Sequence, residues 1–407
     1  MSEGTERSEG GASSKPDGPS EPGRFEETVY HDEQERSMGL LGGALGLALS
    51  LAAGWSAAWA EEEETTEETP LTLEDRIQKL EDELEAVKSE QVEKGNTLAS
   101  LAKIKASGYV QARFVKEEGQ DGPNFLVRRA RLKVRGKVTD TSSATLQLDA
   151  GEGKVSVKDA QVDFAIPNAP VTVTLGQFKW QFGHQVVESS SDRLMPERSR
   201  IVRFAFPGER DRGVAFFIKP PQSKVPTTYV VGLYNGKGTD KEADPVGKDD
   251  DNHLALLGRV AVSPLPNLDV GISAFWDKAS VKVNGANRRK DHDRFGIDLQ
   301  YYPENASVQA EYITARDGKV KGTAPSQTLQ QTKPSGYYVQ YSHSPNPQDT
   351  VVFRYDSFDP DDGTDTIHTW GVALLHQLDE GARLRLAFED NDQKDGRVIT
   401  AEVQVKY

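Results

Sequence analysis

Residues 124–138 read NFLVRRARLKVRGKV, and this stretch decides the fold. Cations recur at every second position, and apolar residues fill most of the positions between them. Successive side chains of a β-strand point to opposite faces, so this spacing predicts a strand with one basic and one apolar face. The basic face carries Arg129, Arg131, Lys133, Arg135 and Lys137. The apolar face carries Leu126, Ala130, Leu132, Val134 and Val138.

The basic row has a length that suits a membrane. At roughly 3.4 Å per residue it extends over about 27 Å, which is most of the thickness of a bilayer's hydrocarbon core. A lysine or arginine that faces lipid at the midplane costs about 2–4 kcal/mol. We therefore expect the apolar face to meet lipid and the basic face to line the interior of a barrel.

The same alternation recurs along the rest of the chain. It predicts an all-β domain over residues 108–407, a transmembrane barrel of sixteen antiparallel strands. The even number leaves both ends of the barrel on the periplasmic side. The expected strands are 108–115, 125–138, 143–150, 155–166, 171–178, 212–219, 227–234, 252–263, 268–277, 292–302, 307–315, 335–344, 349–357, 367–377, 382–389 and 397–407.

Turns and loops between these strands favour the same architecture. Tight turns such as IPNAP (166–170) and YPEN (302–305) contrast with long polar loops at 179–211, 235–251, 278–291 and 316–334. Short turns on one side and long loops on the other are typical of outer-membrane barrels. The final strand puts Ile399, Val403 and Val405 on one face, and it ends on Tyr407, an aromatic terminus like the assembly signal of outer-membrane proteins.

A soluble β-sandwich or propeller is the alternative for any set of alternating strands. The hydrophobic content of 36% would also suit a soluble protein. However, a soluble sandwich needs neither an even strand count nor a systematic alternation of short turns and long loops. Its charged face would also point outward, with a crowded apolar core inside.

The residues before the barrel predict export and a helical segment. Residues 1–37 are a disordered polar tail or a mis-assigned start, with Met38 as the other candidate start. Residues 38–60 end in Ala-Trp-Ala and predict a signal peptide, with a transmembrane anchor as the alternative. An acidic spacer follows at 61–70.

A heptad pattern follows the spacer and predicts an α-helical coiled coil at 71–103. The alternative is a single amphipathic helix packed on the barrel domain, because two polar residues interrupt the apolar seam. The seam residues are Leu73, Ile77, Leu80, Leu84, Val87, Gln91, Lys94, Leu98 and Leu101.

Composition narrows the function classes. The net charge of −15 argues against a nucleic-acid partner. The absence of cysteine removes disulfides, thiolate metal sites and cysteine nucleophiles. We find no spacing of a nucleophile with a base or of metal ligands, so we predict no enzyme activity, no cofactor and no metal.

Further cations lie on the polar faces of other expected strands and, with the basic row, predict an anion pathway. They are Arg113, Arg354, Arg383 and Arg385. Rows of arginine and lysine favour anions in pores, and guanidinium groups match phosphate oxygens bidentately. The alternative is a general porin, in which a basic wall is opposed by an acidic one.

The third long loop, 179–211, is predicted to fold into the channel and narrow it. Apolar residues among its charges, including Met195 and Ile201, would be buried if the loop packed against the channel wall. The alternative is a solvated, charged loop. The candidate constriction residues are Lys179, Arg193, Arg198, Arg200, Arg203 and Arg210, followed by Arg212 where the next strand opens.

Three blocks of this region resemble a known family. LGQFKWQFG (175–183), ESSSDRLMPERSR (188–200) and FPGERDRG (206–213) are similar, in this order, to the phosphate-selective porin O and P family. The resemblance covers roughly residues 105–407. It implies a sixteen-stranded, trimeric outer-membrane channel for anions with an inward-folded third loop. The family's best-known phosphate channels use lysines at the constriction, whereas this loop offers only Lys179 and is otherwise arginine-based.

The leading functional hypothesis is passive, anion-selective diffusion of small solutes such as chloride, phosphate or polyphosphate across the outer membrane of a Gram-negative-type cell. A general diffusion porin without phosphate selectivity is the first alternative. The second is a structural barrel whose helical segment contacts the cell wall or trimer partners. The expected partners are small anions, outer-membrane lipid and two further copies of the chain.

Overall fold

The computed structural model describes residues 73–101, 103–221, 223–238, 253–394 and 396–407. The chain divides into two compact units, Met1–Asp82 and Glu83–Tyr407. The predicted tail, signal peptide and acidic spacer, at 1–37, 38–60 and 61–70, lie outside the described residues.

Helix α1 (Leu73–Leu101) occupies the segment for which the heptad pattern predicts a helix. Four of its seam residues, Ile77, Leu80, Leu84 and Val87, are exposed to solvent. The helix is therefore present, and its association into a coiled coil stays a prediction. Among the described residues, no helix combines the length and the apolar character needed to cross a membrane.

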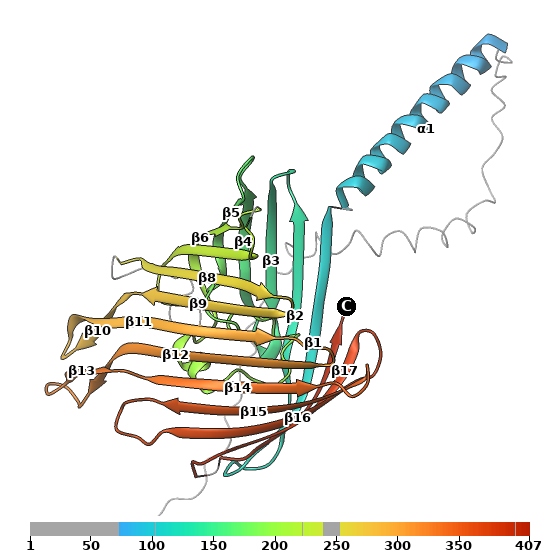
Figure 1. The fold of residues 1–407 in the computed structure, drawn as a ribbon. Helices are drawn as coiled ribbons and strands as arrows, with labels where there is room; N and C mark the ends of the chain where they lie inside the picture. The colour runs from blue at the N-terminus through green and yellow to red at the C-terminus, as the bar shows by residue number, and fades with distance from the viewer. Residues whose placement is uncertain (1–72, 102, 222, 239–252, 395) are drawn as a thin grey trace, which may run out of the picture. The chain divides into compact units, whose positions relative to one another are not determined.

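The described residues from 104 onward form one antiparallel sheet of eighteen strands, sixteen of which build the wall of a closed barrel (Figure 1). The ring closes because β1 pairs with β18. The wall strands are β1 (Ile104–Glu117), β2 (Asn124–Lys137), β3 (Ser142–Asp149), β4 (Ser156–Ala165), β5 (Val171–Lys179), β6 (Arg210–Ile218), β7 (Thr227–Tyr234), β8 (Ala255–Leu265), β9 (Leu268–Trp276), β11 (Ala286–Tyr301), β12 (Ala306–Lys321), β14 (Ser335–His343), β15 (Asp349–Asp359), β16 (Ile367–Gln377), β17 (Ala382–Asn391) and β18 (Val398–Lys406).

The sixteen predicted strands are confirmed, and two predicted loops need correction. The regions 278–291 and 316–334 are largely hairpins, in which β10 (Lys278–Val283) pairs with β11 and β13 (Thr328–Thr332) pairs with β12. β10 is only six residues long and most residues of β13 are polar, so the extended alternation of apolar and polar residues that marks the wall strands is missing there. A short 3-10 helix, η1 (Gly151–Gly153), and helix α2 (Arg200–Ala205) complete the described elements.

The two faces of the barrel wall differ as the alternation predicts. In β18, Ile399, Val403 and Val405 are exposed outward, whereas Glu402 and Gln404 are buried inside. The same division holds around the barrel, where the exposed large side chains are mostly apolar and many of the buried ones are polar. A sheet with this division presents an apolar belt to lipid and a polar lining to its interior.

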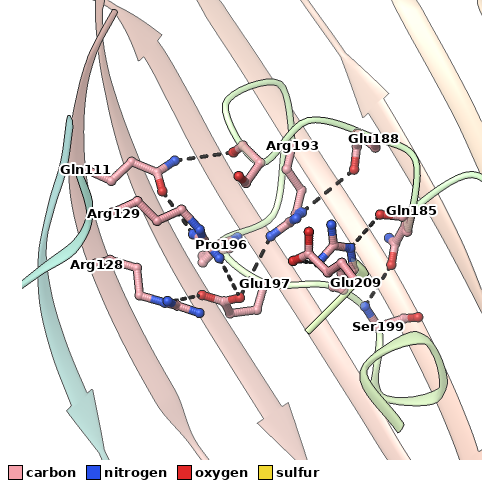
Figure 2. Close-up of polar contacts among 12 residues, drawn as sticks. Gln111, Arg128, Arg129, Gln185, Glu188, Arg193, Pro196, Glu197, Ser199 and Glu209 are labelled. Carbon is pink, nitrogen blue, oxygen red and sulfur yellow. Dashed lines mark hydrogen bonds and ion pairs between the residues drawn. The ribbon is translucent and has the colours of Figure 1, made fainter. Parts of the chain in front are cut away.

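A β-bulge in β2 changes the predicted basic face. Gln111 pairs with Arg129 but Ala112 pairs with Val127, so Arg128 has no residue opposite it. The extra residue shifts the pleat, and Arg128 and Arg129 both point inward (Figure 2). Leu126, predicted to face lipid, instead lines an internal cavity together with Arg128. This prediction was wrong because the bulge depends on pairing with β1, which the alternation within β2 does not reveal.

Candidate anion pathway

The third loop, residues 180–209 between β5 and β6, crosses the inside of the barrel. On one side, Gln404 of β18 donates to the Ser191 carbonyl at 3.1 Å. On the opposite side, the Gly183 N–H donates to Ser273 of β9 at 3.1 Å, and the Gln185 N–H donates to Glu311 of β12 at 3.2 Å. Contacts with strands across the ring place this segment of the chain inside the barrel.

Apolar side chains hold the third loop against the wall. Trp180, Phe182, Ile201, Val202 and Phe206 join strand residues in one buried cluster. The rings of Phe182 and Phe206 lie 4.6 Å apart between centroids. Met195 is buried in a second cluster with residues of β15, β16 and β17. Apolar burial stabilises docking by roughly 25 cal/mol per Å².

Phe204, another apolar residue of the third loop, is less buried than these side chains. Phe204 stays 37% exposed, with its ring 5.2 Å from that of Phe358. The prediction that the apolar residues of the loop are buried therefore holds for Met195, Ile201, Val202 and Phe206, and only in part for Phe204.

A single carboxylate links the loop to the basic wall. Glu197 Oε1 accepts from Arg113 Nη1 at 2.9 Å. The same oxygen accepts from Arg128 Nε at 2.9 Å, and Oε2 accepts from Arg129 Nη2 at 3.2 Å (Figure 2). Arg193 of the same loop lies 3.8 Å from Oε2. We call Glu197 and these four arginines the Glu197 cluster. Charge-assisted bonds of this kind are about twice as strong as neutral ones.

The arginines of the cluster control the ionisation of Glu197. Burial alone would raise the pKa of the carboxyl, but Arg129, Arg128, Arg193 and Arg113 hold that pKa well below its usual range. Glu197 is therefore a permanent anion at neutral pH.

A second carboxylate of the loop plays a similar part near its base. Glu209 pairs with Arg198 and accepts from Arg210 at 3.0 Å, and Arg210 also donates to Asp159 of β4 at 2.7 Å. Burial would raise the pKa of Glu209, but Arg198, Lys179 and Arg210 lower it well below its usual range. Lys179, at the end of β5, also donates to the Glu188 carbonyl at 2.5 Å.

The predicted wall arginines are brought together around the loop. Arg113 and Arg385 share Glu402 of β18, at 2.6 Å and 2.5 Å. Arg383 and Arg385 both donate to the Arg193 carbonyl. These residues form a basic wall whose charge is largely matched by carboxylates.

Two further predicted cations belong to the same paired group. Arg354 pairs with Glu389 at 2.6 Å and donates to the Glu197 carbonyl at 2.7 Å. Arg131 pairs with Asp149 at 2.8 Å and donates to the Ser190 hydroxyl of the loop at 2.8 Å. These two arginines therefore join the loop to carboxylates of β17 and β3.

The last three cations of the predicted row lie at the other end of β2. Arg135 is 3.6 Å from Asp163 and Lys137 is 2.7 Å from Asp140, and both side chains are more than half exposed. Lys133 is half-buried and forms no ion pair with any described carboxylate. Arg135 and Lys137 line a cavity of about 470 Å³ beside the turn between β2 and β3.

A larger cavity, of about 580 Å³, lies between the third loop and the wall on the side of the long loops. We call it the vestibule. Arg200 and Arg203 of α2 line it with Glu197, Asp356 and Glu389. Arg200 donates to the Thr369 hydroxyl at 2.9 Å, and Arg203 is exposed. Within the described residues, neither arginine forms an ion pair with a carboxylate.

Arg212 follows the loop in the next strand, as predicted. It lies in β6, which begins two residues earlier than expected, and it lines a groove with Leu175 and Leu233. Both leucines are exposed on the outer face of the wall. Arg212 therefore lies apart from the cations that gather around the third loop.

Sequence reasoning missed the carboxylates that organise the site. Glu197 stands within one of the recognised blocks, and Glu402 lies among the polar residues that alternate with Ile399 and Val403 in the last strand, yet neither was assigned a role. Their arginines lie far away in the sequence, 84 residues from Glu197 and 289 from Glu402 in the case of Arg113. Opposite charges facing one lumen were the available signal.

Comparison with known proteins agrees with this arrangement. The sequence profile of the phosphate-selective porin O and P family matches residues 105–287. A search of curated protein sequences found no match.

Solved structures share the fold at low sequence identity. The outer-membrane channel DcaP of Acinetobacter baumannii gives a TM-score of 0.56 at 13% identity, covering 75% of this chain and 97% of that one. An anion-selective porin from Comamonas acidovorans gives 0.54 at 15% identity, covering 75% and 98%. OmpT of Vibrio cholerae in its trimer form gives 0.53 at 11% identity, covering 75% and 99%.

The family match and the closed barrel lead to one assignment. The matched residues include the basic strand, the third loop and the blocks that hold Glu197 and Glu209. A sixteen-stranded barrel with an apolar outer belt is the architecture of an outer-membrane porin. Over residues 105–287 the chain is similar to the phosphate-selective porin O and P family, and its barrel has the fold of an outer-membrane porin.

Proposed function

We propose that this porin is an anion-selective diffusion channel for small solutes such as chloride and phosphate, narrowed by the third loop. The observation that carries the proposal is the pair Arg200 and Arg203, which face the vestibule from the loop without a carboxylate partner among the described residues. They lie on α2, where an anion that passes the loop must come close to them.

Paired and unpaired arginines contribute differently to selectivity. An arginine bound to a buried carboxylate adds little net field, because the two charges largely cancel at a distance. Arg113, Arg129, Arg131, Arg354 and Arg385 are in this state. Arg200 and Arg203 on the loop, with Lys133 on β2 and Arg383 on β17, therefore supply excess positive charge along the path.

Conductance of the purified protein in planar bilayers tests the proposal. The native channel should show a reversal potential of the sign for anion preference in a potassium chloride gradient. The double substitution Arg200→Gln with Arg203→Gln should lower the anion-to-cation permeability ratio by about threefold or more. Arg288→Gln with Arg289→Gln is the matched control, because both arginines are exposed on the β10–β11 hairpin and neither lines the vestibule.

Two results would refute the proposal. One is cation preference of the native channel, and the other is an equal effect of the two double substitutions. Either result would favour a general diffusion porin, which the acidic residues Glu152, Asp356 and Glu389 of the same vestibule would suit.

We also propose that export proceeds through residues 38–60 and that the working form is a homotrimer. The exposed seam of α1 supports the association of three such helices, because Ile77, Leu80, Leu84 and Val87 are left uncovered by the described residues. Chemical cross-linking of the native protein and of a variant without residues 71–101 tests this. Loss of cross-linked trimer only in the variant is the expected result.

A further inference from the structure

Glu197 is held as a bound anion would be held. Its two oxygens accept from guanidinium groups of three different residues on β1 and β2, at 2.9, 2.9 and 3.2 Å. A fourth guanidinium, Arg193, is buried beside it, and none of its nitrogens makes a hydrogen bond. Several guanidinium groups around one oxyanion are the usual arrangement for phosphate or carboxylate recognition.

The charges around this carboxylate are not fully matched. The connected ion pairs join five arginines, namely Arg113, Arg128, Arg129, Arg193 and Arg385. The same network contains four carboxylates, namely Glu152, Glu188, Glu197 and Glu402. If an anion with two negative charges took the place of the Glu197 carboxylate between the arginines, the negative charges in contact with the five arginines would also number five.

The loop does not depend on the Glu197 side chain alone for its position. Arg354 donates to the Glu197 carbonyl at 2.7 Å, and Arg113 donates to the Pro196 carbonyl at 3.3 Å. The Ser199 N–H donates to the Gln185 side chain at 2.8 Å. Because these bonds involve the main chain on both sides, the carboxylate can leave its place while the loop stays docked.

The same side chain has room to move. It is 24% exposed and lines the vestibule with Arg128, whereas Arg113 and Arg129 behind it are buried. A rotation about the Glu197 side-chain bonds would turn the carboxylate into the vestibule and open the arginines to a solute.

We propose that Glu197 is a built-in competitor in an anion-binding site, and that a tetrahedral oxyanion with two charges replaces its carboxylate between Arg113, Arg128 and Arg129. The inference deepens the proposed function, on which it rests for the presence of anions in the channel. It makes Glu197 the residue that keeps the binding of phosphate or a phosphate monoester weak enough for release.

Phosphate block of the chloride current tests the role of Glu197. Glu197→Gln removes the competing charge and leaves buried guanidinium groups to be satisfied by solute. We expect inorganic phosphate to block this variant at a concentration about tenfold lower than for the native channel. Titration with glycerol 3-phosphate in a second arm distinguishes a site for free phosphate from one that also accepts its esters.

Glu117→Gln is the matched control. Glu117 lines the vestibule but binds Gln120 rather than an arginine, so its loss changes the local charge equally without freeing the site. This control should shift the phosphate block by less than about twofold. Equal block in all three proteins, or an equal shift in both variants, overturns the inference.

A measurement on the native protein covers the case in which Glu197→Gln does not fold. Crystals soaked in tungstate, a heavy analogue of phosphate, should show anomalous density between Arg113 and Arg129 with the Glu197 side chain turned away. Tungstate bound only elsewhere overturns the inference.

The two proposals fail separately. Cation preference of the native channel, with tighter phosphate block in Glu197→Gln, refutes anion selectivity and leaves the binding site in place. Anion preference of the native channel, with the same phosphate block in Glu197→Gln as in the native protein, supports anion selectivity and refutes the binding site.

Discussion

The middle and the end of β2 carry the same kind of residue on the same face, yet they differ in every other respect. Arg129 and Arg131 are buried and bound to Glu197, Asp149 and the third loop. Four and six residues further along from Arg131, Arg135 and Lys137 are exposed and meet carboxylates only at the surface. One alternating pattern therefore encodes an internal anchor at one depth and a solvated charge at another.

Depth explains the difference. A buried guanidinium must be paired, because leaving one charge of a buried pair alone costs about 3–5 kcal/mol. An exposed pair contributes about 0–1 kcal/mol, since water screens both charges. The arginines in the middle of β2 hold the loop in place, and the cations at its end face the solution.

Removal of a middle arginine should have the largest effect. Arg131→Met leaves Asp149 buried without its guanidinium and removes the bond to Ser190. We expect the free energy of unfolding to fall by about 3–5 kcal/mol. Urea unfolding of the barrel in detergent micelles measures the change.

Lys133→Met, two residues away on the same face, is the control for this comparison. It should change the free energy of unfolding by no more than about 0.5 kcal/mol. A similar loss of unfolding free energy in both variants would show that the burial of a cation on β2 does not decide how much it contributes to stability.

Acid should have a smaller effect and only at low pH. The pKa values of Glu197 and Glu209 lie well below the usual range, so both contribute stability above the unfolded value of about 4.3. That stability is lost only as the pH falls through the lower folded values. Fluorescence of Trp180, which is buried in the loop core, should therefore stay constant from neutral pH down to about 4.3 and change below it.

Two results bear on the acid prediction. Absence of a change in Trp180 fluorescence below about 4.3 would mean that the carboxylates of the loop are not held by their arginines. The variant Glu197→Gln should lose part of the acid transition, because one of the two titrating groups is gone.

Substitutions next to the bulge in β2 should have the smallest effect on the stability of the barrel. Val127 faces lipid near the end of its strand, so Val127→Lys should cost about 1 kcal/mol or less. Leu126 faces the vestibule, so Leu126→Lys should cause no measurable loss of stability. Refolding yields into lipid vesicles, compared between the two variants, check the order. The reverse order would place Leu126 on the lipid side.

Much of the barrel could be predicted because one local rule governs it. A strand that separates lipid from water must alternate, and this requirement located all sixteen wall strands, including β7 and β16 with their ends. The same rule placed Arg354 and Arg385 inside. The hairpins of β10 and β13 escaped it because they extend beyond the apolar belt.

The details of the site depend on partners that alternation does not specify. The bulge at Arg128 requires β1 beside β2, and the pairing of Arg113 requires Glu402 on β18. The difference between paired and unpaired arginines follows from such contacts. Sequence patterns therefore located the basic face, and the three-dimensional arrangement decided which of its charges face a solute.

The pairing of β1 with β18 has a consequence for how this protein assembles. Gly108 and Tyr407 exchange two backbone hydrogen bonds, at 2.9 and 3.0 Å, and join strands roughly three hundred residues apart. Until β18 arrives, β1 presents an open edge to any other strand, including one from a second copy. We therefore expect ring closure to be the slow, committing step of folding, and Arg113 of β1 has no access to Glu402 before it. Assembly in the membrane should be all-or-none, with no stable half-barrel.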